Sequence, residues 1–448
     1  MRIAMIGGGY VGLVSGACFA DLGVEVAVVE TDATKLDALQ NGRIPIYEPG
    51  LDRLVAENVA AGRLTFSDDL ATAVAGVEAV FIAVGTPTRR GDGHADVSYV
   101  NAAAEQVARA LTGYAVVVTK STVPVGTGRR IAQIMRHARP ELEFDVASNP
   151  EFLREGSAIG DFMRPDRVVI GAESERAREV LRRLYRPLYL IEAPILFTSL
   201  ETAELTKYAA NSFLAMKVTF INEMADLCER VGADVQDVAR GIGLDGRIGR
   251  KFLNAGPGFG GSCFPKDTLA LMRIAQDWGA PSRLVEATVA VNDARKSAMS
   301  ARIVQAFGGS VHGKVIAVLG LTFKPETDDM RDAPSIPIVS RLAEEGAILR
   351  TFDPVGMSHA KDLLPPSVQF CADAYDAATG ADALILVTEW NEFRALSPER
   401  LADLMRGRLL MDLRNVFDPA VFLEAGFDYR GVGRGLQAFR EQTKKAEG

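Results

Sequence analysis

The N-terminal segment restricts the possible folds of this chain more than any other. A short apolar run, Arg2–Ile6, leads directly into Gly7, Gly9 and Gly12, which have GxGxxG spacing. After a strand, glycines at this spacing provide a tight turn, a bare backbone beside a pyrophosphate, and close packing of the following helix. The segment therefore predicts a dinucleotide-binding Rossmann domain; a structural glycine turn without a ligand is the alternative interpretation.

Glu30 indicates which dinucleotide to expect. It closes the second β-branched run, Glu25–Glu30, 18 residues after Gly12. A carboxylate at this position can accept hydrogen bonds from the ribose hydroxyls of adenosine and would repel a 2′-phosphate. We therefore expect NAD rather than NADP as the cofactor. Lys35 is a candidate for the adenosine side of the site, with a solvated helix lysine as the alternative.

The alternation of β-branched runs and amphipathic stretches continues over the first ~190 residues and predicts a doubly wound parallel sheet. The readable strands are Arg2–Ile6, Glu25–Glu30, Ala79–Val84, Ala115–Thr119 and Phe144–Ala147, and the clearest helices are Tyr10–Leu22 and Val97–Leu111. The pattern changes at Leu200–Val231, which holds no Gly or Pro and has helical apolar spacing. A helix of about 30 residues is roughly 45 Å long and suits a link between domains or a dimer interface.

The last part of the chain restarts the α/β pattern. After a second helical stretch, Leu269–Phe307, buried strands are expected at KVIAVLG, AILRTFDP, ALILVTEW and LLMDLRN, with a helix at Ser335–Glu345. The fold class is therefore α/β: two Rossmann-like doubly wound domains joined by a long central helix and a helical dimerisation region. We expect domains at 1–198, 199–310 and 311–448, since a domain averages roughly 150 residues.

Composition narrows the class of protein. The formal net charge of −8 argues against a nucleic-acid partner, because phosphate backbones are bound by clustered Lys and Arg. No apolar run approaches the ~18 residues of a membrane span, so no membrane partner is expected. The first residues do not read as a basic-then-apolar leader, so no secretory signal is expected. Scattered cysteines and only four histidines predict no zinc site and a reduced, cytoplasmic protein.

The most informative segment is GPGFGGSCFPKD, residues 256–267, which places Cys263 in a glycine-rich loop. Lys266 and Asp267 follow closely, and a cation beside a thiol favours the reactive thiolate. A thiol beside a nicotinamide indicates oxidation past the aldehyde: addition to the aldehyde gives a thiohemiacetal, a second hydride loss gives a thioester, and water releases the acid. The other three cysteines are expected to be buried and inert, because Cys18 and Cys228 lie in apolar helical patterns and Cys371 lies near a probable strand end.

Other candidates follow predicted strands or share helix faces. Thr86 and Thr122 lie at the carboxyl ends of strands, where ligands collect in parallel sheets, although they could be ordinary loop hydroxyls. Glu151 and Glu155 are four residues apart and could hold a base or a water, or form a solvated pair.

On the long helix, Lys207 and Asn211 are also four apart. A lysine in an apolar stripe needs an anion, so this pair is a candidate for oxyanion stabilisation.

These motifs together resemble the UDP-glucose/GDP-mannose dehydrogenase family. The resemblance is carried in family order by GGGYVGLVSG, YEPGL, GTP, STVPVGT, NPEFLREG, AELTKYAANSFLAMKVTFINE, GPGFGGSCFPKD and GLTFKPETDDMRDAPS. It implies a four-electron oxidation of a sugar C6 hydroxyl with two NAD per turnover, and a C-terminal domain that binds UDP. Glu30 is a small departure, since many members of the family have Asp there.

The resemblance also implies roles for individual residues. The catalytic group would be Cys263, Lys207, Asp267, Asn211, Glu151 and Thr122, with the roles of Glu151 and Asp267 in acid–base chemistry left open. NAD would contact Gly7, Gly9, Val11, Gly12, Glu30, Lys35, Thr86, Thr122, Glu155, Lys266 and Arg331. The sugar nucleotide would contact Glu151, Phe152, Leu153, Lys207, Asn211, Phe252, Leu253, Asn254, Ala255, Gly256, Gly260 and Lys324. Arg247 would reach the substrate of a neighbouring subunit, so a homodimer through the central helix is implied.

The resemblance makes UDP-glucose the expected substrate. Ser262 before Cys263 argues against the branch that oxidises N-acetylmannosamine, which often has His there. The same chemistry on UDP-galactose or GDP-mannose remains an alternative. A catalytically silent protein that binds NAD and a nucleotide sugar is another, although such a protein has no chemical need for Cys263, Lys207 and Asp267 together.

Overall fold

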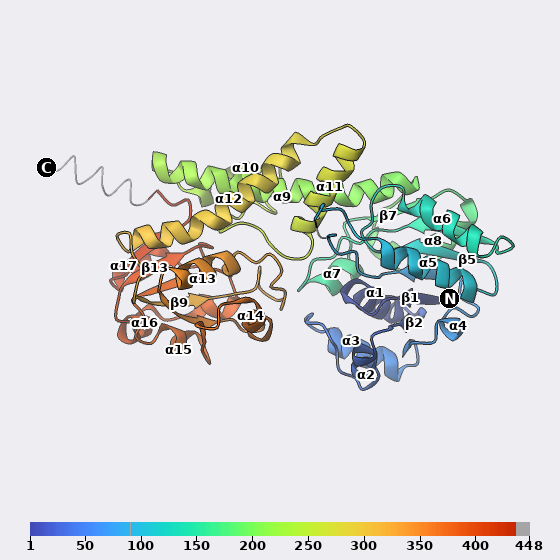
Figure 1. The fold of residues 1–448 in the computed structure, drawn as a ribbon, viewed down its shortest axis with the longest axis horizontal. Helices are drawn as coiled ribbons and strands as arrows, with labels where there is room; N and C mark the ends of the chain where they lie inside the picture. The colour runs from blue at the N-terminus through green and yellow to red at the C-terminus, as the bar shows by residue number, and fades with distance from the viewer. Residues whose placement is uncertain (90, 436–448) are drawn as a thin grey trace. The chain divides into compact units, whose positions relative to one another are not determined.

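A computed structural model of the chain describes residues 1–89 and 91–435 (Figure 1). Its contacts divide the chain into two compact units. The first unit is Met1–Ala210 with Leu269–Ala280, and the second is Asn211–Thr268 with Pro281–Gly448. Two helices, α9 (Leu200–Val231) and α11 (Phe264–Asp277), contribute residues to both units. The expected division into three domains stays a prediction.

The first unit contains an eight-stranded sheet of order β3-β2-β1-β4-β5-β6-β7-β8. Its strands are parallel except where β6 meets β7. The strands are β1 (Arg2–Ile6), β2 (Glu25–Val29), β3 (Leu64–Ser67), β4 (Ala79–Ile82), β5 (Ala115–Thr119), β6 (Phe144–Ser148), β7 (Val168–Ala172) and β8 (Ile195–Thr198). All five predicted strands of this sheet are confirmed, whereas β3, β7 and β8 were not predicted.

Helices cover both faces of this sheet, as a parallel sheet requires. They are α1 (Tyr10–Asp21), α2 (Ala33–Gln40), α3 (Leu51–Ala60), α4 (Leu70–Ala73), α5 (Ser98–Ala110), α6 (Thr127–Ala138), α7 (Ala158–Met163) and α8 (Glu175–Leu184). Alternate residues of β1 enter two separate cores: Ile3 and Met5 pack with Phe19 of α1, and Ala4 and Ile6 pack with α5 and α6. The sheet is therefore buried on both sides.

The second unit contains a fully parallel six-stranded sheet of order β11-β10-β9-β12-β13-β14. The strands are β9 (Val315–Leu319), β10 (Ile348–Phe352), β11 (Gln369–Phe370), β12 (Ala383–Leu386), β13 (Leu409–Asp412) and β14 (Asp428–Gly431). The surrounding helices are α13 (Ser335–Glu344), α14 (Met357–Leu363), α15 (Ala374–Ala378), α16 (Pro398–Leu404) and α17 (Pro419–Glu424). Two doubly wound sheets and a long central helix confirm the predicted fold class, while dimerisation stays a prediction.

The helices that follow α9 along the chain differ from the prediction in one respect. The expected stretch Leu269–Phe307 is two helices, α11 and α12 (Arg283–Ala306). Gly279 has φ +67° and Pro281 follows, so the chain cannot continue as one helix there. Within the second unit, Ile221 of α9 and Ile303 of α12 share a core with the second sheet. None of the helices in residues 1–89 and 91–435 is long and apolar enough to cross a membrane.

Candidate active site

The glycine turn after β1 has the geometry that a pyrophosphate needs. Gly7 has φ +106°, and a Cβ on Gly12 would lie 1.9 Å from the carbonyl oxygen of Gly7, so a side chain at position 12 would block the turn. A Cβ on Gly9 would meet no atom within 4 Å, which leaves the backbone open at the N-terminus of α1. Because a helix N-terminus attracts anions, these residues fit the phosphates of a dinucleotide.

Glu30 lies directly after β2, beside this turn. Its Oε2 accepts a hydrogen bond from the Gly8 N–H at 3.0 Å, and its Oε1 accepts one from the Asp32 N–H at 2.9 Å. A carboxylate can accept about four hydrogen bonds, so lone pairs remain for two ribose hydroxyls. Glu30 therefore orients the glycine turn and still fits the ribose contact expected from the sequence.

The other candidates of the first unit follow successive strands at the same edge of the sheet. Thr86 follows β4, Thr122 follows β5, and Glu151 follows β6, and these three strands are neighbours. Thr86 and Glu151 are buried, and Thr122 is half-buried. The structure thus brings the strand-end candidates to one edge, where ligands bind in parallel sheets.

Lys207 meets a carboxylate, as the sequence suggested. Its Nζ donates to Glu151 Oε1 at 3.0 Å, and the two side chains are only 3% and 7% exposed. Glu151 Oε2 accepts from the Leu153 N–H at 2.5 Å, and the Lys207 ammonium lies 5.4 Å from the centre of the Phe152 ring. A buried ion pair is costly to break from one side, so each partner fixes the other.

A second buried lysine at this edge was missed by the sequence analysis. Lys120 is 4% exposed and donates to Asn149 Oδ1 at 3.1 Å and to the Tyr185 hydroxyl at 3.3 Å. Burial lowers the pKa of Lys120 to about 8, Glu151 opposes that shift, and Lys207 adds to it. Lys120 therefore helps to set the electrostatic environment of the Lys207–Glu151 pair.

Glu48, in the YEPGL segment, is another residue whose importance the sequence did not reveal. Its carboxylate accepts from the Gly156 N–H at 2.6 Å, from the Ala158 N–H at 2.8 Å and from the Tyr10 hydroxyl. Tyr10 begins α1, directly after the glycine turn. Glu48 thereby links the cofactor-binding helix to the loop that carries Glu151 and Glu155.

In the second unit, Cys263 lies immediately before the first residue of α11. Its carbonyl oxygen accepts the Asp267 N–H at 2.8 Å, and the residue is half-buried. A helix N-terminus stabilises negative charge and favours a thiolate. By contrast, Cys18, Cys228 and Cys371 are buried, and burial raises the pKa of Cys18 to about 12.

The cysteine loop, residues 256–263, packs against the loop after β9. These two segments are separate motifs in the sequence and contact each other in the structure. Gly261 N–H donates to the Arg331 carbonyl at 2.8 Å, and Ser262 N–H donates to Asp329 Oδ2 at 3.1 Å. A Cβ on Gly260 would lie 2.3 Å from the Asp332 carbonyl oxygen. Glycine is needed because the two backbones touch, and the contact brings Arg331 next to the cysteine loop.

Asp267 is the most enclosed polar group of this loop, at 1% exposure. Its Oδ2 accepts from Asn211 Nδ2 at 2.6 Å, and its Oδ1 pairs with Lys266 Nζ. The predicted grouping of Asn211, Lys266 and Asp267 with Cys263 is therefore present within the second unit. Asn211 lies one helical turn after Lys207 on α9.

In the second sheet, Asp353 occupies the position that Glu30 has in the first, but its surroundings differ. Asp353 directly follows β10, as Glu30 follows β2, but its carboxylate is 1% exposed. Asp353 accepts from the backbone of Leu321 at 2.7 Å, of Thr322 at 3.1 Å and of Gly356 at 2.7 Å, and from Trp390 Nε1 at 3.1 Å. The Leu321 N–H contact matches the one from Gly8 to Glu30, but the additional donors and the burial of Asp353 leave no site on this carboxylate for a ribose hydroxyl.

Comparisons with known proteins identify the family. Its NAD binding, central and UDP binding domains match residues 1–189, 201–294 and 317–419. A UDP-glucose 6-dehydrogenase of Rhizobium meliloti is 61% identical over 97% of this chain and 100% of its own length. One of Bacillus subtilis is 47% identical over 97% of this chain and 93% of its own. The structure of a UDP-glucose dehydrogenase from Pyrobaculum islandicum, 40% identical, matches with a TM-score of 0.88 over 96% of this chain and 97% of its own.

The chain belongs to the UDP-glucose/GDP-mannose dehydrogenase family. Membership confirms three expectations from the sequence: the family resemblance itself, an oxidoreductase activity, and NAD as the cofactor. The NAD-binding match covers the glycine turn and Glu30, and the UDP-binding match covers Lys324 and Arg331.

Some residues that the family resemblance implied lie apart from these clusters. Lys35 is exposed in the first turn of α2, and Asn254 is exposed in the loop before Cys263. Arg247 has a side chain that is 89% exposed and pairs with Asp245. The individual roles of these residues stay predictions.

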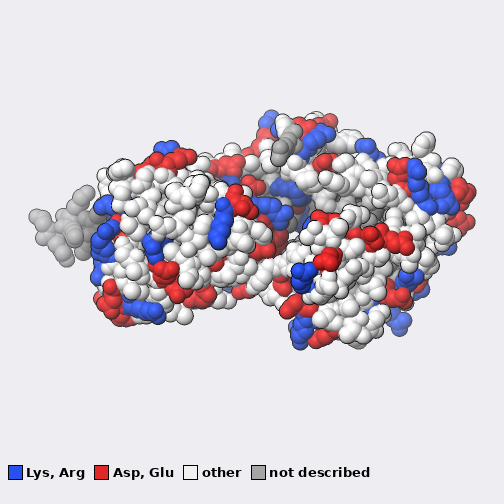
Figure 2. Space-filling model, turned by 60° about the horizontal axis from the view of Figure 1, so that its bottom comes forward, with Lys and Arg blue, Asp and Glu red and all other residues white. Residues whose placement is uncertain are grey.

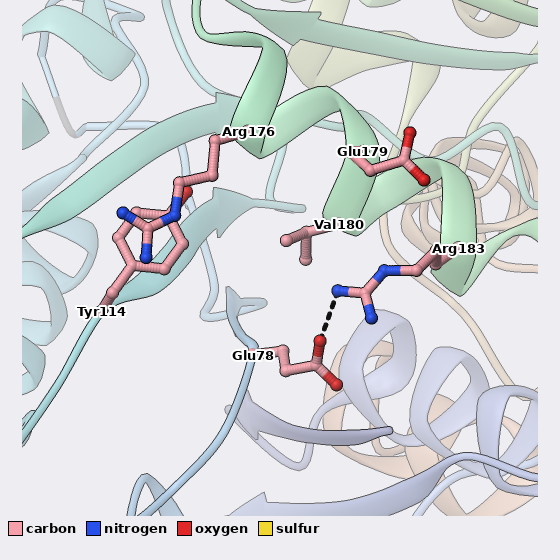
Figure 3. Close-up of a pocket in the computed structure, with 6 residues that line it drawn as sticks. All are labelled: Glu78, Tyr114, Arg176, Glu179, Val180 and Arg183. Carbon is pink, nitrogen blue, oxygen red and sulfur yellow. Dashed lines mark hydrogen bonds and ion pairs between the residues drawn. The ribbon is translucent and has the colours of Figure 1, made fainter.

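A surface pocket of about 400 Å³ in the first unit is not part of the NAD-binding edge (Figure 3). It is lined by Glu78, Tyr114, Arg176, Glu179, Val180 and Arg183. Glu78 and Tyr114 directly precede β4 and β5, so the pocket lies at the amino ends of the strands. Arg183 pairs with Glu78, and Arg176 stacks 3.3 Å from the centre of the Tyr114 ring.

Figure 2 shows acidic and basic side chains interspersed over the face that it presents.

Proposed function

We propose that this family member oxidises C6 of UDP-glucose twice, with two NAD, to give UDP-glucuronate. The observation that carries the proposal is Cys263, half-buried at the start of α11 beside the Lys266–Asp267 pair. A dehydrogenase that stops at the aldehyde or ketone needs no thiol, whereas a thiol can hold the aldehyde for a second oxidation. The relative at 61% identity, a UDP-glucose 6-dehydrogenase, supports UDP-glucose as the sugar nucleotide.

In this proposal Cys263 forms the covalent bond. Its sulfur adds to the aldehyde carbon formed by the first hydride loss, and the aldehyde oxygen becomes the hydroxyl of a thiohemiacetal. The second hydride loss from the same carbon gives a thioester. Water then adds to the thioester carbonyl, the C–S bond breaks, and the acid leaves as Cys263 regains its thiolate. Bound NAD supplies the hydride acceptor, and the glycine turn and Glu30 would hold it.

Lys207 is proposed to stabilise the oxygen on C6 when it carries negative charge. A buried ammonium acts strongly on an alkoxide because little water screens it. Its partner Glu151, at 3.0 Å, fixes the position of the ammonium and is proposed to exchange a proton with that oxygen. This assignment gives Glu151 to the oxidation steps.

Asp267 and Asn211 are proposed to serve the hydrolysis step. The 2.6 Å hydrogen bond between them orients the carboxylate one helical turn after Cys263. A carboxylate in that position can accept a proton from the attacking water. Asn211 is the hydrogen-bond partner of Asp267, which supports assigning both groups to the same step.

The stoichiometry of NADH tests the proposal directly. With UDP-glucose in limiting amount, we expect two NADH per sugar and UDP-glucuronate as the product. UDP-galactose and GDP-mannose, measured in parallel, should give much lower kcat/KM. One NADH per sugar would contradict the second oxidation, and no turnover of UDP-glucose would contradict the substrate. Binding of NAD and UDP-glucose without NADH would instead identify a silent nucleotide-sugar-binding protein.

We also propose that α9 forms a dimer interface. Phe213, Phe220 and Leu227 are 58%, 47% and 50% exposed and are spaced by seven residues, so they lie along one face of the helix. A stripe of large exposed apolar side chains on a long helix is expected to be covered by another chain. The occupant proposed here is a second copy, whose Arg247 would reach the sugar nucleotide.

Replacing both Phe213 and Phe220 by Arg should convert the dimer to a monomer, measured by light scattering after size exclusion. The charged side chains would oppose each other at the centre of the interface. The KM for the sugar nucleotide should rise together with the monomer fraction, because Arg247 would come from the partner. Tyr99→Arg, which changes a 60% exposed aromatic on α5, is the matched control. If the double variant has the same mass in solution as the wild type, this face of α9 is not the dimer interface.

A further inference from the structure

Glu204 is a buried carboxylate on α9 that neither the motifs nor the proposed reaction uses. It is 2% exposed, three residues before Lys207. Its Oε2 accepts the Gly126 N–H at 2.6 Å, and its Oε1 accepts the Gly128 N–H at 2.7 Å. These donors lie at the N-terminus of α6, which starts at Thr127. Glu204 therefore caps α6 from a helix 76 residues later in the chain.

The close approach of the two helices depends on the residue at position 128. A Cβ on Gly128 would lie 3.2 Å from Glu204 Oε1 and 3.3 Å from the Leu200 side chain. Both are tighter than ordinary van der Waals contact. A side chain at position 128 would thus push the carboxylate away from the helix N-terminus.

The segment held by Glu204 is the loop that carries Thr122. On one side of Thr122, the Ser121 hydroxyl donates to the Val84 carbonyl at 2.6 Å. On the other side, the Thr127 hydroxyl donates to the Pro124 carbonyl at 2.6 Å, and Glu204 holds Gly126 and Gly128. Thr122 is therefore fixed between the end of β4 and helix α9.

We propose that Glu204 is a positioning residue: its carboxylate holds the Thr122 loop against α9, one helical turn from Lys207. This inference rests on the proposed function in so far as Thr122 and Lys207 act on the same substrate. The carboxylate form is the one that works, because both of its oxygens accept. A protonated carboxyl has a hydrogen on one oxygen and loses one of the two backbone hydrogen bonds.

The pKa of Glu204 lies in the range where this change matters. Burial raises it to about 7, while the N–H groups of Gly128 and Gly126 oppose the shift. The charged groups around it are Glu201 on α9, which raises the pKa, and Arg129 on α6, which lowers it and pairs with Glu201 and Glu173.

The sign of the resulting pH dependence follows from this raised pKa. Because the pKa of Glu204 is higher in the folded chain than in the unfolded chain, the protonated carboxyl adds to the free energy of unfolding. This contribution is complete below pH 4.5, the ordinary pKa of a Glu, and is lost as the pH rises through about 7. The doubly bonded loop is therefore favoured above about pH 7, where the fold gives up some stability.

Glu204→Gln tests the proposal, because the amide is neutral and can accept at only one oxygen. At pH 8 we expect kcat to fall roughly tenfold, the factor of about one charge-assisted hydrogen bond, with the dissociation constant for UDP-glucose unchanged. In the wild type we expect kcat to rise as the pH increases through about 7, because the carboxylate form of Glu204 holds the Thr122 loop. This rise should be absent in the variant. A wild-type kcat with the rise retained would overturn the proposal.

Glu201→Gln is the matched control, three residues earlier on α9 with a side chain 38% exposed. It should keep the rise in kcat, displaced to slightly lower pH because Glu201 raises the pKa of Glu204. If Glu204→Gln does not fold, Gly128→Ala should give the same loss of kcat by displacing the carboxylate; an unchanged kcat in Gly128→Ala would contradict the proposal.

Amide hydrogen exchange separates this inference from the proposed reaction. Residues 122–128 should exchange faster in Glu204→Gln than in the wild type at pH 8, and in the wild type their protection factors should be smaller below pH 7 than above it. This readout needs no substrate, so it stands even if UDP-glucose is not oxidised. Equal protection of the segment in both proteins would overturn the link between Glu204 and the loop.

Discussion

Replacing Cys263 by serine is expected to stop NADH formation from UDP-glucose while the protein still binds the sugar nucleotide. A serine hydroxyl is not ionised at neutral pH, so it cannot replace a thiolate at the start of α11. The loop itself should keep its structure, because the Gly261 N–H donates to the Arg331 carbonyl and the Ser262 N–H to the Asp329 carboxylate, and the substitution leaves both hydrogen bonds in place. Initial rates and the dissociation constant for UDP-glucose measure the two effects.

The buried cysteines provide the control for Cys263. Cys371→Ala removes a thiol that is 5% exposed within the core of the second sheet, so it should reduce the midpoint of thermal unfolding and leave the rate of NADH formation intact. Near-normal NADH formation by Cys263→Ser would contradict the covalent route, whatever the behaviour of the control.

Replacing Lys207 by methionine is expected to lower kcat by ~10²–10³-fold, because a preorganised charge at a developing oxyanion has an effect of that size. The same change leaves Glu151 buried without its 3.0 Å partner, so the free energy of unfolding should also fall. The rate and the unfolding midpoint must therefore be measured on the same protein.

The double variant Lys207→Met with Glu151→Gln separates these two effects. Removing both charges relieves the buried carboxylate, so much of the lost stability should return, while kcat should stay low. Recovery of kcat together with stability would mean that Lys207 acts on folding alone and would remove it from the mechanism.

Much of the fold follows from local patterns in the sequence. The run Arg2–Ile6, the glycines after it and the uninterrupted stretch Leu200–Val231 each specify an element through their own residues, and the structure has each of them. Two of the three missed strands lack this signal: β3 (Leu64–Ser67) and β8 (Ile195–Thr198) are short and only partly buried. The third, β7 (Val168–Ala172), is fully buried and β-branched, so its sequence carried the signal and the strand was overlooked. The break between α11 and α12 was signalled by Gly279 and Pro281, but helical periodicity on both sides obscured it.

The residues that hold the candidate site together were harder to predict. Cys263 is marked by glycines next to it, whereas Glu48 lies 108 residues from Gly156, and Glu204 lies 78 residues from Gly126. An isolated Glu between apolar residues looks like an ordinary solvated side chain. Its role depends on backbone N–H groups from a distant loop, and only the folded chain brings these donors to it.

The glycine turn after β1 limits how the chain can handle its cofactor. The turn after β9 lacks GxGxxG spacing, so the described residues contain one GxGxxG turn that follows a strand and is open to a dinucleotide. A four-electron oxidation at one such turn requires an exchange: the first reduced cofactor must leave and a fresh oxidised one enter before the sugar is finished. The half-oxidised sugar must outlast that exchange without escaping, and in the proposed mechanism the covalent bond to Cys263 would retain it during that time.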